Sequence, residues 1–199
     1  MKKLSLHGLG YSLLVAGAAA LLAACAKDAP VAPDRAPVPA AYVAASNGTR
    51  APELPAGCEK LQIDAGSKLV FHAYAKGVQI YRWNGTSWSF VGPSAVLSAD
   101  ATGMSTVGTH YATPGGPAWE SVSGSKVIGA VIERCTPDAN SIQWLKLGAV
   151  SSEGPGIFAR VAFILRVNTA GGTAPSDAGA LGELREVPYT TSYLFYRKP

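Results

Sequence analysis

Short runs of alternating hydrophobic and polar residues dominate the chain from residue 68 onward, and they predict β-strands. A period of two is typical of a strand with one buried face, whereas a helix repeats its apolar positions every 3.6 residues. Turn-forming Gly, Ser and Pro separate the runs, a spacing typical of an all-β fold: a single antiparallel β-sandwich or a barrel-like domain. The predicted strands cover residues 68–75, 78–83, 86–91, 125–135, 142–150, 160–168 and 189–197.

The run at 160–168 shows the alternation most clearly. Val161, Phe163, Leu165 and Val167 alternate with Arg160, Ala162, Ile164 and Arg166. This pattern predicts a strand near the sheet surface rather than a helix.

Two dipeptides in the first strands predict tight turns. Lys76-Gly77 is a plausible two-residue turn, and Asn84-Gly85 is a strong hairpin signal. Together they predict a three-stranded sheet in which Tyr81 lies opposite both His72 and Trp88. One face then carries His72, Tyr74, Tyr81, Trp83, Trp88 and Phe90, and the other carries Leu69, Phe71, Ala73, Ala75, Val78 and Ile80.

The aromatic face has two interpretations. Exposed to solvent, and extended by Trp119, it would bind sugars or other flat amphipathic ligands, because rings stack on apolar ligand faces while polar tips bind hydroxyls. Alternatively, both faces are buried and the aromatic side chains form a sandwich core. A one-residue slip in either turn would scatter the face.

Residues 1–24 have the features of an export signal. Lys2 and Lys3 precede an apolar run at 13–22, which is shorter than the roughly 20 residues that span a bilayer. The run ends in Leu-Ala-Ala-Cys at 22–25, which resembles the lipobox of bacterial lipoproteins. We therefore expect lipid on Cys25 and a membrane anchor, with Ala26 favouring the outer membrane of a Gram-negative host. The alternative is an ordinary secretory peptide in which Cys25 is incidental.

The segment that follows predicts a tether. Residues 25–56 contain the lipidated cysteine and a Pro/Ala-rich stretch without apolar periodicity, which we expect to be disordered. Residues 57–199 are long enough for one compact domain.

The chain has three cysteines, and lipid on Cys25 leaves Cys58 and Cys135 as a pair. Outside the cytoplasm two such thiols usually form a disulfide. Closing so long a loop stabilises the fold by about 4 kcal/mol in the chain-entropy model.

Charge argues against nucleic acid as a partner. Removal of residues 1–24 takes away Lys2 and Lys3, so the formal net charge falls from +4 to +2. No cluster of Lys and Arg remains to contact phosphates.

Five unusual motifs follow one another along the chain: Phe-His-Ala-Tyr-Ala-Lys-Gly-Val-Gln-Ile-Tyr at 71–81, Gly-Thr-His-Tyr at 108–111, Pro-Ala-Trp-Glu at 117–120, Val-Asn-Thr-Ala-Gly-Gly-Thr-Ala-Pro at 167–175 and Val-Pro-Tyr-Thr at 187–190. In this order they resemble the bacterial and fungal family known as domain of unknown function 3455. The family's Gly-Pro-Thr-Trp is Gly-Pro-Ala-Trp here, after an extra Thr-Pro-Gly at 113–115. The resemblance implies secretion and a compact β-rich fold. Some members are named malate dehydrogenases, but no Gly-x-Gly-x-x-Gly between a strand and a helix is present to hold a dinucleotide.

Candidate catalytic residues are few. His110, Glu120 and Glu153 are the candidates, and with His72 they would form the site of a hydrolase or a metal-dependent enzyme. No His-x-His or His-x-x-x-His spacing supports a metal site, so we expect neither metal nor cofactor. The histidines are otherwise explained as structural residues hydrogen-bonded beneath loops, and the acids equally well as solvated groups or as partners of Arg160 and Arg166.

The function that these patterns favour is a non-catalytic lipoprotein module of the cell envelope. Its ligand would be an extended molecule such as a glycan, bound by His72, Tyr74, Tyr81, Trp83, Trp88 and Trp119. The alternatives are a hydrolase or metal-dependent enzyme and a purely structural envelope lipoprotein.

Overall fold

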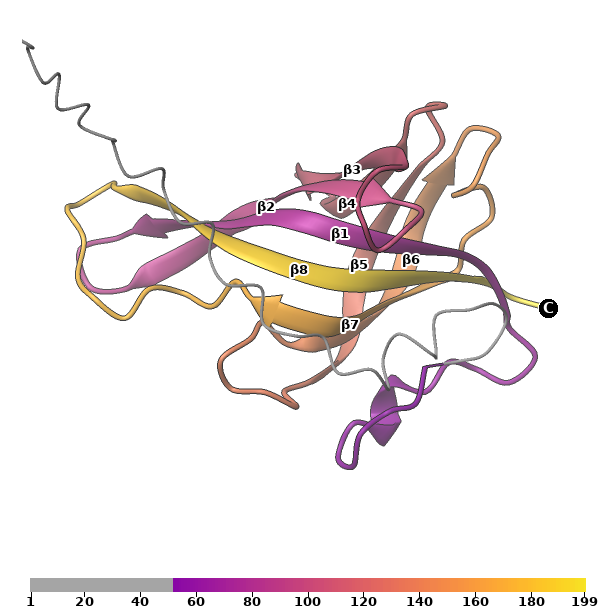
Figure 1. The fold of residues 1–199 in the computed structure, drawn as a ribbon, viewed down its shortest axis with the longest axis horizontal. Coiled ribbons are helices and arrows are strands. Elements are labelled where there is room, and N and C mark those ends of the chain that lie inside the picture. Colours follow the sequence, from indigo (N-terminus) through magenta and orange to yellow (C-terminus); the bar gives the residue numbers. More distant parts are fainter. Residues whose placement is uncertain (1–51) are drawn as a thin grey trace, which may run out of the picture. The chain divides into compact units, whose positions relative to one another are not determined.

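Eight antiparallel strands close into a barrel in the computed structural model, which describes residues 52–199 (Figure 1). Each strand pairs with the next along the chain, and the last pairs with the first. The elements are η1 (Glu59–Leu61), β1 (Lys68–Trp83), β2 (Trp88–Ser98), β3 (Thr106–Thr113), β4 (Gly116–Ser121), β5 (Lys126–Cys135), β6 (Trp144–Glu153), β7 (Phe163–Gly171) and β8 (Leu184–Arg197). The expected all-β antiparallel fold is confirmed, in its barrel form.

The predicted signal peptide, Cys25 and the predicted tether up to residue 51 lie outside the described residues. Within the described part, no helix is long and apolar enough to cross a membrane.

The predicted turn at Lys76-Gly77 is wrong, because β1 runs through it as one strand of 16 residues. Gly77 pairs with Ala95 on β2 and with Tyr189 on β8. A Cβ atom at Gly77 would lie 2.1 Å from the Ser94 carbonyl oxygen, so the position requires glycine for close approach of two strands rather than for a turn.

The hairpin after β1 is present, but its loop is longer than predicted. Residues 84–87 form the loop and Trp83 pairs with Trp88, whereas a two-residue turn would have paired Tyr81 with Trp88. The Asn84 side-chain oxygen accepts hydrogen bonds from the Thr86 and Ser87 backbone N–H groups, which stabilises this loop.

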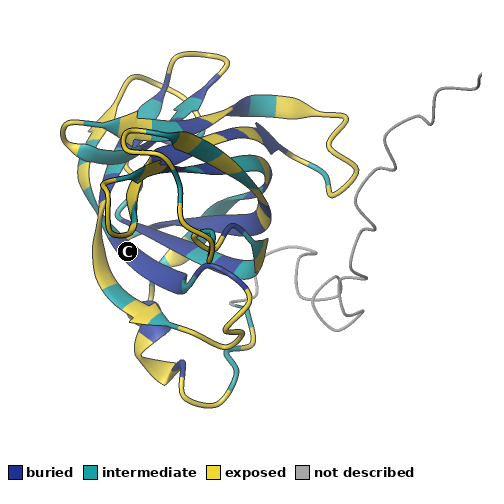
Figure 2. Ribbon diagram, turned by 90° about the vertical axis from the view of Figure 1, so that its left-hand side faces the viewer, coloured by how far each residue is buried: buried dark blue, intermediate teal, exposed yellow. Residues whose placement is uncertain are grey.

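Side chains from strands all around the wall form the core of the barrel. Figure 2 shows buried residues, in dark blue, on many of these strands. On β1, Ala73, Ala75, Gln79 and Tyr81 are buried, so the odd-numbered residues face inward. The members of this interior cluster are Ala73, Ala75, Ala95, Leu97, Trp119, Val127, Ile142, Leu145, Leu147, Phe158, Val161, Ile164, Tyr189, Tyr193 and Phe195.

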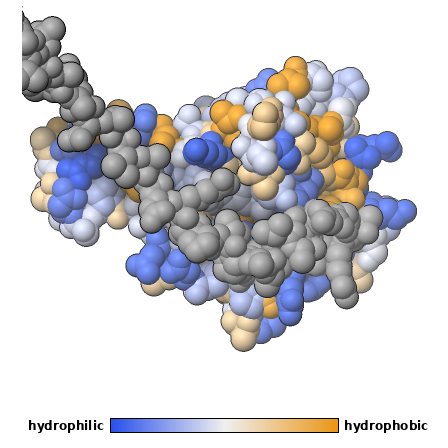
Figure 3. Space-filling model, in the orientation of Figure 1, coloured by the Kyte–Doolittle hydropathy of each residue, from blue (hydrophilic) through white to orange (hydrophobic). Residues whose placement is uncertain are grey.

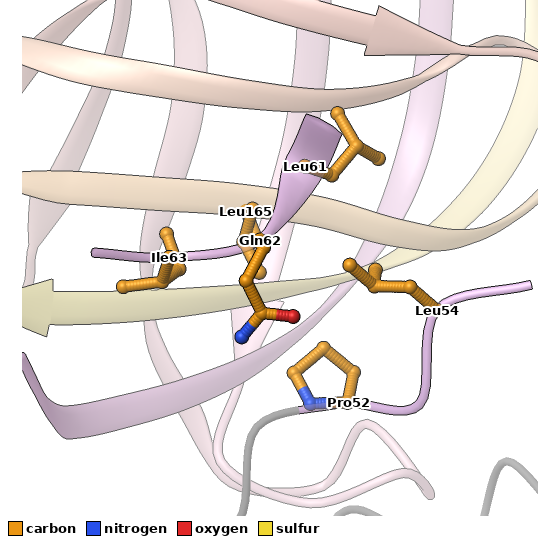
Figure 4. A pocket seen from close by; sticks show the side chains of 6 residues that line it. All are labelled: Pro52, Leu54, Leu61, Gln62, Ile63 and Leu165. Atoms are coloured by element: carbon orange, nitrogen blue, oxygen red, sulfur yellow. The ribbon is translucent and has the colours of Figure 1, made fainter. Parts of the chain in front are cut away.

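A second apolar cluster lies on the outer face of the barrel, under the segment that precedes β1. Leu54, Leu61 and Ile63 of this segment gather around Leu165 of β7 (Figure 4). The crevice between them has no room for a water molecule, so it is a packing seam. The buried members of this outer cluster are Cys58, Leu61, Ile63, Trp144, Phe163, Leu165, Val167, Leu194 and Tyr196.

The predicted disulfide is present and holds this segment on the barrel. Cys58 bonds to Cys135 at the end of β5, with a Cα–Cα distance of 5.4 Å. Lys146 adds a polar contact, donating to the Gln62 carbonyl oxygen at 2.8 Å and pairing with Asp64 at 2.9 Å.

Three strands continue beyond the barrel at one end. Residues 79–83 of β1 pair with residues 88–93 of β2 and residues 184–187 of β8, while β3 and β7 pair only with deeper parts of β2 and β8. We call this three-stranded part the β2–β1–β8 extension, and it forms the left-hand end of Figure 1.

Candidate functional site

Four aromatic side chains share the inward face of the β2–β1–β8 extension. Trp83 lies opposite Trp88 and Tyr81 opposite Phe90, with ring centroids 5.4 and 5.6 Å apart. Phe90 is 55% exposed, Trp83 and Trp88 are partly exposed, and Tyr81 is buried. We call these four residues the aromatic face; it runs from solvent toward the barrel mouth.

The loop at 172–183 fixes two of these rings. The Trp88 indole N–H donates to the Asp177 carbonyl oxygen at 2.8 Å, and the Arg185 guanidinium lies 4.7 Å from the Trp88 ring centroid. The Tyr81 hydroxyl donates to the Gly172 carbonyl oxygen at 2.7 Å. These contacts hold the rings in one orientation before any ligand arrives.

Arg185 also organises the acids of this loop. It pairs with Asp177 at 2.6 Å and with Glu183 at 3.0 Å. Its guanidinium is the main cause that lowers the pKa of Asp177, whereas the Ala180 backbone N–H is the main cause that lowers the pKa of Glu183. Both carboxylates are thus engaged outside the barrel interior.

Arg166 of β7 points into the barrel. It lies opposite Tyr193 on β8 and Leu145 on β6, and both partners belong to the interior cluster. Directly opposed residues of antiparallel strands project to the same side. The Arg166 Nε donates to the Gln143 carbonyl oxygen at 3.0 Å, and its side chain remains partly accessible.

Neutral polar groups surround this cation. Tyr193 lies beside Arg166 and Tyr189, and Tyr189 lies beside Gln79. Burial raises the pKa of both tyrosines, so their hydroxyls stay protonated. The two hydroxyls and the Gln79 amide nitrogen are buried without a protein hydrogen-bond partner of normal geometry. We call Arg166, Gln79, Tyr189 and Tyr193 the interior donor group.

His110 and Trp119 form a stacked pair in the core. Their ring centroids are 4.5 Å apart with planes 13° from parallel, and both residues are almost fully buried. The His110 Nδ1 lies 2.8 Å from the Ala118 carbonyl oxygen, which fixes the hydrogen on Nδ1. Burial, aided by the charge of Arg166, lowers the pKa of His110 to about 3, so the ring is neutral.

The structure brings together three of the six predicted ligand-binding residues: Tyr81, Trp83 and Trp88. His72 and Tyr74 lie on the outer face of β1, with ring centroids 4.4 Å apart, because the strand does not turn at residue 76. Trp119 is 1% exposed within the core and does not extend the aromatic face.

The candidate catalytic residues lie on different sides of the barrel wall. Glu120, Lys126 and Glu153 form one row across β4, β5 and β6, with the lysine between the acids. The Tyr111 hydroxyl donates to Glu120, which raises the pKa of this tyrosine. Because His110 is interior, these carboxylates and its ring do not share a surface.

Neither acid pairs with an arginine, contrary to one expectation, since Arg166 points inward and no described ion pair contains Arg160. Within residues 52–199, no group of three or more His, Cys, Asp or Glu residues is placed to hold a metal ion.

A depression of about 200 Å³ lies elsewhere, on the outer face beside η1. It is smaller than the roughly 300–1,000 Å³ of ordinary small-molecule sites. Its lining residues are Gln62, Ile63, Asp64, Ala65, Gly66, Ser67, Leu69 and Tyr196.

The interior donor group escaped sequence reasoning. Gln79 and Tyr189 sit in stretches that resemble the family, but nothing local distinguishes them from surface residues. Arg166 occupies an alternating position of its strand, and the pattern alone does not show which side of that strand is interior. Only the register with Tyr193 and Leu145 places it.

Comparison with known proteins gives a family and nothing finer. The family model described as "Protein of unknown function (DUF3455)" matches residues 64–197, more than half of the chain. No curated protein and no solved structure matches.

Proposed function

We propose a function from the site itself, because the chain belongs to the DUF3455 family, whose description, protein of unknown function, assigns none. The barrel is a non-catalytic cell-envelope module that binds an extended ligand, such as a glycan, on the aromatic face of the β2–β1–β8 extension. The observation that carries this proposal is the half-open cluster of Tyr81, Trp83, Trp88 and Phe90.

The chemistry of the cluster supports a sugar-like ligand. An exposed Phe90 and partly exposed tryptophans offer ring faces to the apolar side of a pyranose, while the Arg185 side chain lies alongside Trp88. In Figure 3 the left-hand end of the molecule is mostly blue and pale rather than orange. A surface of this kind suits an amphipathic ligand better than a purely apolar surface would.

Preorganisation supports binding as well. Asp177 and Gly172 hold the indole of Trp88 and the hydroxyl of Tyr81 through hydrogen bonds, so these rings lose little freedom when a ligand stacks on them.

The test is binding of soluble oligosaccharides to the full chain by isothermal titration calorimetry. Phe90→Ala and Trp83→Ala each weaken binding about tenfold, the effect of losing roughly 1.4 kcal/mol of stacking. Tyr74→Ala is the matched control, since it removes an aromatic ring from the outer face of the same strand and leaves affinity unchanged.

Thermal unfolding of each variant separates lost contacts from lost folding. Equal weakening by Tyr74→Ala, or no binding of any oligosaccharide to the folded wild-type chain, contradicts the proposal.

We also propose that the module is held on a membrane by lipid on Cys25, which lies outside the described residues. The lipobox-like Leu-Ala-Ala-Cys at 22–25 supports this anchor. Mass spectrometry of the membrane-extracted protein should find a diacylglyceryl mass on an N-terminal Cys25, and Cys25→Ala should release the protein into the soluble fraction. An unmodified Cys25 in membrane-extracted material refutes the anchor.

A further inference from the structure

The barrel interior gathers polar side chains whose hydrogen-bonding capacity is only partly used. The Gln79 amide nitrogen and the hydroxyls of Tyr189 and Tyr193 have no protein partner of normal geometry, although each residue is at most 2% exposed. Arg166 adds a guanidinium whose Nε donates to the Gln143 carbonyl oxygen and which also contacts the Tyr193 hydroxyl. Buried donors left in this state destabilise a fold unless something accepts from them.

The positive charge of Arg166 has no carboxylate partner among the described residues. The ion pairs found among residues 52–199 use Lys60, Lys146 and Arg185 as their cations, and none includes Arg166. The neighbouring groups are neutral, since His110 carries no charge and the two tyrosines are protonated. A half-buried cation among neutral donors favours a negatively charged occupant.

The interior donor group lies next to the aromatic face. The Tyr81 hydroxyl donates to the Gly172 carbonyl oxygen at 2.7 Å, and a Cβ atom at Gly172 would lie 2.9 Å from Tyr189 Cβ and 3.1 Å from Gln79 Cγ. The charge of Arg166 also reaches Tyr81, whose pKa it lowers against the effect of burial. A ligand resting on Phe90 and Trp83 can therefore direct one group toward the guanidinium. The side chain is partly accessible, so that group need not open the barrel.

We propose that the interior donor group is an oxyanion site, in which Arg166, Gln79, Tyr189 and Tyr193 bind the carboxylate or phosphate of a ligand whose remainder lies on the aromatic face. The ligand class is therefore an acidic glycan, one that bears uronate or phosphate groups. The identity of the remainder rests on the proposed function, whereas the oxyanion site does not.

The oxyanion site is tested first with small anions and the full chain. Acetate and inorganic phosphate, each compared with chloride at equal ionic strength, raise the Tm of the wild type by about 2–4 °C at concentrations well above the Kd. The anion with the larger shift identifies carboxylate or phosphate as the preferred group.

Two kinds of variant link this shift to the site. Arg166→Gln removes the charge and abolishes the shift. Tyr189→Phe removes an unpartnered hydroxyl, so it leaves the Tm in chloride unchanged or higher while reducing anion affinity several-fold. Tyr196→Phe is the control, because it removes an unpartnered hydroxyl from the outer cluster and leaves the anion shift intact.

An equal shift in the wild type and Arg166→Gln, or no shift in the wild type, overturns the oxyanion site. Should Arg166→Gln fail to fold, Tyr189→Phe decides, since a merely structural hydroxyl would not alter anion affinity.

Acidic and neutral forms of one sugar then test the ligand class. Oligogalacturonate binds the wild type at least tenfold more tightly than its methyl ester, and Arg166→Gln reduces that ratio to about one while leaving affinity for the ester unchanged. If neither sugar binds but the anion shift is present, the proposed function fails and the oxyanion site stands. If both sugars bind equally well to the wild type, the oxyanion site fails and the proposed function stands.

Discussion

The neutral, buried imidazole of His110 makes a quantitative prediction about acid stability. In an unfolded chain this ring takes up a proton near pH 6.5, but in the barrel its pKa is about 3, chiefly because burial disfavours the charged form. Between these two values the unfolded state binds a proton that the folded state does not. The free energy of unfolding therefore falls as the pH drops below 6.5, by about 1.4 kcal/mol per pH unit from this group alone, and the loss ends near pH 3.

His110→Phe isolates this contribution. Phenylalanine keeps a ring against Trp119 but does not titrate, and it loses the hydrogen bond to Ala118, at a cost of about 1 kcal/mol at pH 7. Between pH 6.5 and 4.5 the wild type should lose about 2–3 kcal/mol more stability than the variant. Protonation of carboxylates is common to both proteins and cancels in the difference.

The assay is urea denaturation of wild type and variant at both pH values. Phe158→Leu is the control: it also weakens the barrel interior, where Phe158 is fully buried, but its pH dependence should match that of the wild type. If His110→Phe loses as much stability on acidification as the wild type, the imidazole titrates normally. The interior around His110 would then be open to water, and burial would not be what keeps the ring neutral.

Three further predictions concern the fold. Replacing Cys58 and Cys135 together by Ser lowers the free energy of unfolding by about 4 kcal/mol in urea titrations, and an unchanged value would show that the disulfide does not constrain the unfolded chain. Gly77→Ala lowers it by about 3 kcal/mol or more, because the new Cβ meets backbone on β2; a smaller loss by the same titration would mean that the strands can separate. Trp119→Ala costs about 3–5 kcal/mol but Phe90→Ala less than about 1, and similar costs would contradict the contrast between core and aromatic face.

Local signals predicted the fold class, most of the strands, the hairpin after β1 and the disulfide, but not the register of that hairpin. Period-two alternation was enough for most strands, and Tyr81, Trp83 and Trp88 share a face because they flank a real turn within eight residues. The short β3 and β4 were not predicted: Thr106–Thr113 and Gly116–Ser121 carry few large apolar residues.

The predictions from sequence were wrong where a residue that resembles a local signal is required by a contact with a distant strand. Gly77 resembles a turn residue, but it is required by the approach of β2, which no local pattern encodes. The false turn inverted the relation of His72 and Tyr74 to Tyr81, because a strand that continues keeps residues of opposite parity on opposite faces. Assigning Trp119 to the core requires the pairing of β4 with β3 and β5, which the sequence pattern does not reveal.

The orientation of β7 shows most clearly why the oxyanion site was beyond sequence reasoning. Its more apolar side, with Phe163, Leu165 and Val167, faces outward, which a barrel strand tolerates only if something covers it. The segment before β1 provides that cover through Leu61, and the disulfide to β5 keeps it there.

The outward side chains of β7 are buried by this segment in the outer cluster. The strand therefore has its apolar burial on the outer side, and its inward side can include an arginine. The direction of Arg166 thus depends on a contact made about a hundred residues earlier in the chain. An apolar residue at position 166 would pack in the interior without introducing an uncompensated charge. Ligand binding therefore explains the inward arginine better than packing does.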